Sequence, residues 1–120
     1  MEKKMEALIG ELYEDINFLG FNATYFRNNT YVRNCRELFP KIQEFVQWFL
    51  EQVTGLEEGV YRNLADILKD CETALREQDQ VLMMDALEEG IAGYLEMFLS
   101  EEYFREKETA YGTRAEKQES

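Results

Sequence analysis

The chain has 120 residues, of which 45% are hydrophobic and 13% are aromatic, and its formal net charge is −12. A single domain with a real core is expected at this length, and the apolar content excludes global disorder. The excess of 25 acidic over 13 basic residues argues against nucleic-acid binding, because phosphates would be repelled, and favours a basic protein partner.

The chain contains no apolar run near the roughly 18 residues that a membrane span needs. Its first stretch, MEKKMEALIGELYEDI, is charged throughout and lacks the pattern of a secretory signal. We therefore expect a cytoplasmic protein with no membrane partner. In that compartment Cys35 and Cys71 should be free thiols at core-facing positions, with a redox pair as the alternative.

The first predicted helix covers residues 5–26, where apolar side chains recur every three or four positions. It stops at residues 27–30, RNNT, which are typical of helix ends and N-caps. A second stripe with the same spacing covers residues 32–53. Pro40 lies inside it, and proline removes a backbone hydrogen bond and clashes with the preceding turn. We expect a kink there or a break into two helices.

The third predicted helix covers residues 60–75 and follows an acidic turn at residues 54–59. Asp79 is a natural N-cap in the next corner. The fourth helix covers residues 82–98, with an extension toward Phe104 as an option.

Four helices joined by short connectors predict an all-α protein, an up-down-up-down four-helix bundle over residues 1–104. Residues 105–120 lack a continuing stripe and should form a solvated tail or a helix extension. The competing architecture is an elongated helical dimer that completes its core in trans.

The chain lacks the usual tools of catalysis. It has no histidine, the commonest general acid-base group and metal ligand, and no glycine-rich phosphate loop. We expect no enzyme activity, no cofactor and no metal. The weaker alternative is a hard cation on carboxylate pairs such as Glu11 with Glu14, or Asp85 with Glu88.

Residues 82–98 carry two helical stripes side by side. The core stripe uses Leu82, Met84, Leu87, Ile91, Tyr94, Leu95 and Phe98. The second stripe consists of methionines and small residues: Met83, Ala86, Gly90, Gly93 and Met97. Each glycine costs a helix interior about 1 kcal/mol relative to alanine, so this stripe needs an explanation.

One interpretation of the second stripe is a Met/Gly groove that receives a helix of another protein, because methionine adapts to partners of varied shape. An acidic face beside it would attract a basic partner: Asp85, Glu88, Glu89 and Glu96. The alternative is close approach of a helix in the same bundle, for which the first helix offers Gly10 and Gly20.

Two further features are open to more than one interpretation. A basic patch, Arg27, Arg33, Arg36 and Lys41, lies near aromatic residues and superficially resembles an RNA-binding surface, but we favour the alternative of a bundle surface whose charges are balanced locally. Several aromatic residues do not fit one core stripe and must either widen the buried face or reach a surface. They are Phe18, Phe21, Tyr25, Tyr31, Phe45 and Trp48.

The corner between the third and fourth helices carries Ala74-Leu75, Asp79, Val81-Leu82 and Asp85-Ala86-Leu87. With these residues, the segment 64–99 resembles a helical hairpin of small, uncharacterised acidic proteins of Gram-positive bacteria. Gly90 and Gly93 depart from that pattern, so no binding surface is carried over. The resemblance implies a bacterial cytoplasmic helical bundle and no activity.

Together these features predict a non-catalytic, protein-binding bundle, either an adaptor or a secretion-chaperone-like factor. The first alternative is a self-assembling homodimer with the stripe and the spare aromatics at its seam. The second is a bundle that holds a small apolar ligand between its helices.

Overall fold

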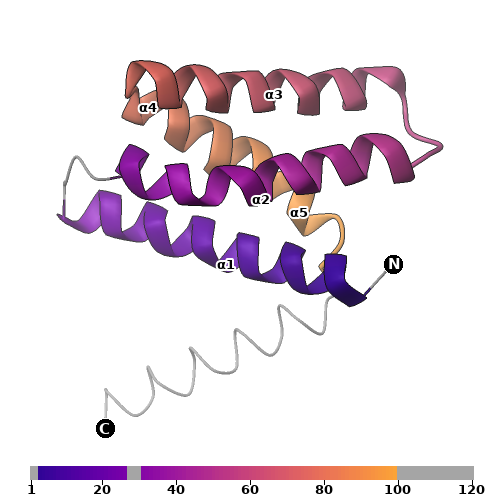
Figure 1. The fold of residues 1–120 in the computed structure, drawn as a ribbon, viewed down its shortest axis with the longest axis horizontal. Helices are drawn as coiled ribbons and strands as arrows, with labels where there is room; N and C mark the ends of the chain where they lie inside the picture. The colour runs from indigo at the N-terminus through magenta and orange to yellow at the C-terminus, as the bar shows by residue number, and fades with distance from the viewer. Residues whose placement is uncertain (1–2, 27–30, 100–120) are drawn as a thin grey trace, which may run out of the picture.

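The computed structural model describes residues 3–26 and 31–99, and this part of the chain is helical with no strand (Figure 1). Four rods make up the fold. The first three are α1 (Lys3–Phe26), α2 (Tyr31–Gln52) and α3 (Glu58–Glu77), and the fourth consists of α4 (Gln80–Met84), η1 (Asp85–Ile91) and α5 (Ala92–Glu96). The all-α, four-helix prediction is confirmed.

Each rod packs chiefly against two others, and α2 also contacts α4. α1 contacts α2, α2 contacts α3, and α3 contacts α4 and η1, while η1 and α5 return to α1. The α2–α3 connection lies at the opposite end of the bundle from the α3–α4 corner (Figure 1). This arrangement encloses one continuous apolar cluster, to which all four rods contribute.

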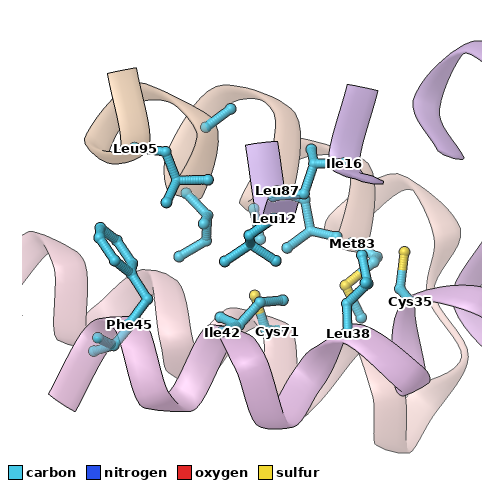
Figure 2. Packing of buried hydrophobic residues seen from close by; sticks show 14 of the residues in the cluster. Leu12, Ile16, Cys35, Leu38, Ile42, Phe45, Cys71, Met83, Leu87 and Leu95 are labelled. Atoms are coloured by element: carbon cyan, nitrogen blue, oxygen red, sulfur yellow. The ribbon is translucent and has the colours of Figure 1, made fainter. Parts of the chain in front are cut away.

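The core follows the predicted stripes but is wider than they are. Leu12 and Ile16 of α1 and Leu87 and Leu95 of the fourth rod face α2 across the core (Figure 2). Both cysteines are buried there, as expected. Because a helix between two neighbours buries more than one stripe, further side chains are buried that the stripes had left out: Ile9, Tyr31, Leu38 and Phe45.

Helix α2 runs unbroken through Pro40, so the predicted alternative of two separate helices is wrong. Pro40 is exposed, and its ring therefore does not disturb the packed face. Burial of eight side chains along α2 offsets the backbone hydrogen bond that proline removes.

The α3–α4 corner forms as its residues predict. The Asp79 side chain accepts a hydrogen bond from the Leu82 amide at 3.1 Å, which confirms Asp79 as the N-cap of α4. Gln78 ends α3 in the left-handed conformation, with φ at 55°, and its amide bonds to the Ala74 carbonyl. The Asp79 amide donates to the same carbonyl at 3.0 Å, so that two amides satisfy this carbonyl at the left-handed end of α3.

The predicted tail, residues 105–120, and the optional extension toward Phe104 lie outside the described residues. Within the described residues, every helix is too short or too polar to cross a membrane.

Candidate functional site

The fourth rod changes its helical period in the middle. Over η1 the backbone bonds link residues five apart, so that the Ala92 amide donates to the Leu87 carbonyl. This is π-helical geometry, which is rare and is found mostly as single turns inside α-helices, frequently at functional sites. Buried side chains follow the wider period, since Ala86 and Ile91 are five apart, as are Leu87 and Ala92.

This change of period divides the predicted Met/Gly groove. Met83 is 1% exposed and Ala86 is 5% exposed, so both belong to the core. Gly90 is half-buried, Gly93 is exposed, and Met97 is 53% exposed. The predicted stripe assumes a uniform α-helical period. The extra residue in the π-turn rotates the side chains that follow it about the helix axis, so the assumption fails after η1. The doublets Ala-Leu and Ile-Ala, five residues apart, were the available sequence signal.

Gly90 allows α3 to approach the fourth rod closely. A Cβ atom at Gly90 would lie 2.9 Å from Cγ2 of Ile67, closer than real Cβ contacts come. The interpretation as an internal contact therefore holds at Gly90, but the neighbour is α3 rather than the first helix. A Cβ atom at Gly10 would meet nothing within 4 Å, and one at Gly20 would overlap the Glu88 carboxylate.

Gly93 has no such neighbour in the part of the chain that the structure describes, where a Cβ atom at this position would meet nothing within 4 Å. It lies instead in a shallow surface groove of about 330 Å³ between α3 and α5. We call this the α3–α5 groove. Its described lining is mainly apolar and consists of Leu56, Val60, Asn63, Ile67, Glu89, Gly90, Gly93, Tyr94 and Met97.

One wall of the groove is held in place by hydrogen bonds. The Tyr94 hydroxyl donates to the Val60 carbonyl at 2.9 Å and accepts from Nδ2 of Asn63 at 2.9 Å. Behind it, the Tyr94 ring packs edge-on against Phe49, with centroids 5.4 Å apart. These contacts tie α5 to the start of α3 and preform the groove.

The α2–α3 connection supplies the end of the groove. The Tyr61 hydroxyl donates to the Val53 carbonyl at 2.8 Å and accepts from the Leu56 amide at 3.3 Å. Leu56 is thereby fixed at the surface, where it is 37% exposed. Sequence reasoning missed Leu56, Val60 and Ile67 as groove residues because they come from another helix, which only the tertiary packing brings alongside.

The four predicted acidic residues do not share one surface role. Glu89 lines the groove, and Asp85 and Glu96 are exposed. The Glu96 carboxylate accepts a hydrogen bond from the Tyr13 hydroxyl of α1 at 2.9 Å. Glu88 packs over Gly20 of α1, and burial raises the pKa of its carboxyl group, with the charges of Asp85 and Glu89 adding to the shift.

The two buried thiols have low reactivity. Burial raises the pKa of Cys35 and of Cys71 to about 12, so both are protonated at neutral pH and are poor nucleophiles. They are free cysteines. Within the described part of the chain, no group of three or more His, Cys, Asp or Glu side chains is placed to hold a metal ion.

Comparison of the chain with protein-family models, with curated proteins and with solved structures finds no match.

Proposed function

We propose that this protein is a non-catalytic, cytoplasmic, up-down-up-down bundle, with α2 bent at Pro40, that binds another protein in the α3–α5 groove. It would serve as an adaptor or as a secretion-chaperone-like factor. The observation that carries the proposal is Gly93, which is exposed in an apolar groove and has no neighbour among the described residues that requires a glycine.

The low helix propensity of glycine at position 93 supports a role for this residue in contact with another molecule. Glycine in a helix interior is about 1 kcal/mol less favourable than alanine, and at Gly90 the close contact with Ile67 accounts for it. At Gly93 no contact within the described residues does so. A partner backbone or side chain seated against Gly93 would give the same kind of close approach from outside.

The partner that fits this groove is a short amphipathic helix with basic residues beside its apolar face. Leu56 and Met97 offer exposed apolar surface at the groove, and methionine adapts its shape to the partner. Glu89 is the acidic residue in the lining, and the net charge of −12 would attract a basic segment from a distance.

The test compares two identical substitutions at different places. Gly93→Leu would fill the groove, whereas Gly10→Leu adds the same side chain to open space on α1. Both variants exchange a helical glycine for leucine and should melt at or above the wild-type temperature. Tagged wild type, Gly93→Leu and Gly10→Leu are used to retain proteins from the native host at moderate salt.

The proposal predicts a partner that is retained by the wild type and by Gly10→Leu but lost from Gly93→Leu. Its affinity should fall between low and moderate salt, because the charge contribution is screened. Equal retention by both variants would remove the groove from the interaction. Salt-insensitive binding would remove the contribution of Glu89 and of the overall charge.

A homodimer is the second candidate, favoured by a different surface. Phe18 and Phe21 of α1 are both 64% exposed and lie three residues apart on one helix. Exposed aromatic residues are enriched at protein interfaces. Sedimentation equilibrium of the purified protein decides between the two, since a mass twice that of the monomer, lost in Phe18→Ser, would assign α1 as a dimer seam.

A further inference from the structure

A second recess is lined by residues from the start of α2 and from the α3–α4 corner. These two segments lie together at the end of the bundle opposite the α2–α3 connection (Figure 1). Its volume is about 440 Å³. The described residues that line it are Val32, Arg33, Arg36, Gln78 and Gln80. A volume of this size lies within the range of small-molecule sites.

The described residues that line this recess carry positive charge, whereas the molecule as a whole is strongly negative. Arg33 and Arg36 are three residues apart on α2 and therefore lie on the same face of the helix. Neither forms an ion pair with another described residue. By contrast Lys41, further along α2, is held by Glu11 at 2.6 Å and by Asp15 at 3.8 Å.

No acidic side chain is among the described residues that line the recess. Glu37, Glu77 and Asp79 are close in sequence, but none of them is among the lining residues. The Asp79 carboxylate is occupied as the N-cap of α4, where it accepts from the Leu82 amide. The first turn of α2 contains no acidic residue.

Two glutamines line the recess together with the arginines. Gln78 holds the left-handed conformation at the end of α3, and Nε2 of Gln80 contacts the Met84 sulfur at 3.8 Å. Thioether sulfur is a weak acceptor, so this amide is easily redirected to a stronger one. Each amide contributes two N–H donors.

We propose that this recess binds the phosphate group of a small phosphorylated molecule. The planar guanidinium fork of arginine matches the geometry of phosphate oxygens and binds them through paired hydrogen bonds. Arg33 and Arg36 supply the charge, Gln78 and Gln80 supply neutral donors, and buried Val32 contributes an apolar surface. The volume exceeds that of a phosphate ion and leaves space for the group that the phosphate carries.

The test titrates the full chain with phenyl phosphate and, separately, with inorganic phosphate, while the backbone amides are followed by NMR. Shifts should be centred on residues 32–36 and 78–80. Arg33→Gln and Arg36→Gln should each weaken binding of phenyl phosphate about tenfold, because each removes a charged fork of hydrogen-bond donors. Arg36→Lys, which keeps the charge but loses the fork, should also bind more weakly.

Arg62→Gln is the matched control, because Arg62 is exposed on α3 and pairs only with Glu58 among the described residues. It should bind as the wild type does. Tighter binding of phenyl phosphate than of inorganic phosphate assigns the recess to a phosphorylated molecule, and equal binding assigns it to free phosphate. The proposal fails if neither compound shifts these amides at about 10 mM, or if the Arg33→Gln, Arg36→Gln double variant binds as well as the wild type.

Discussion

Gly90 and Gly93 lie three residues apart on the same rod and both line the α3–α5 groove, yet only Gly90 has a close neighbour among the described residues. Gly90 is pressed against Ile67 of α3, whereas Gly93 is exposed and opens into the α3–α5 groove. The same contrast extends along the predicted stripe, from buried Met83 to exposed Met97. Small residues at helical spacing therefore serve two different purposes in one helix. Gly90 permits a close internal contact, and Gly93 leaves an open surface.

The π-turn is what separates the two environments. With a uniform α-helical period, Met83, Gly90 and Met97 would lie on one face, seven residues apart. The extra residue of η1 rotates the later part of the rod, so that Met83 turns toward the core while Met97 stays at the surface. The fold thus uses one segment both to complete its core and to shape a groove.

The largest expected effect separates the two methionines. Met83→Ala should lower the free energy of unfolding by about 2–5 kcal/mol, because it opens a cavity in a packed core. Met97→Ala should change it by less than about 0.5 kcal/mol, since the side chain is already half in solvent. Urea unfolding of both variants measures the difference. Equal losses of unfolding free energy in the two variants would contradict the assignment of Met83 to the core and of Met97 to the surface.

The two glycines should respond to alanine with opposite signs. Gly90→Ala should lower the free energy of unfolding by about 1–3 kcal/mol, because the new methyl group overlaps Ile67. Gly93→Ala should raise it by about 0.5–1 kcal/mol through helix propensity alone. Thermal unfolding of the two variants gives both signs.

A double-mutant cycle sharpens the assignment of the contact at Gly90. In an Ile67→Ala background the overlapping atoms are gone, so Gly90→Ala should cost little or become favourable. If Gly90→Ala costs the same with and without Ile67, the close approach is not what requires the glycine.

The smallest expected effect on stability comes from Glu88, whose side chain packs over Gly20 of α1. Its carboxyl pKa is raised from the usual 4.5, so the folded state holds the proton more tightly than the unfolded chain does. Stability is therefore lost as pH rises from below 4.5 through the raised pKa, and stays lost above it. Glu88→Gln avoids this loss.

The expected result is that Glu88→Gln unfolds at higher urea concentration than the wild type near about pH 7, and that the difference disappears near about pH 3.5. Glu44→Gln is the control, because it makes the same exchange at an exposed glutamate on α2. A Glu88→Gln effect that is the same at both pH values would show that packing over Gly20, rather than ionisation, is responsible.

Much of the fold can be predicted from the sequence, because the helices and their caps depend on residues that are close together in the chain. Helix α1 was expected over residues 5–26 and is found at Lys3–Phe26, because a regular apolar stripe dictates a helix. The Asp79 cap is equally local, since its partner is three residues away. These features need no knowledge of the neighbouring helices.

The groove could be predicted only in part, because it depends on two helices at once. Gly93 and Met97 were recognised as an unusual surface, but Leu56, Val60 and Ile67 join them through the packing of α3. The π-turn also depends on tertiary packing, which makes the wider period favourable where Ala86 and Ile91 are both buried. Sequence patterns that assume a single period place Met83 and Ala86 on the wrong side.

The most direct test of the open groove is the rate at which a thiol placed at residue 93 is alkylated in the isolated protein. In Gly93→Cys the new thiol should react as fast as the one in Val81→Cys, at a site that is 70% exposed. Cys35 and Cys71 should stay unmodified, since each is buried with its pKa raised to about 12. Protection of the thiol at residue 93 in the free monomer, as strong as that of Cys35 and Cys71, would contradict the account and make the stripe an internal contact.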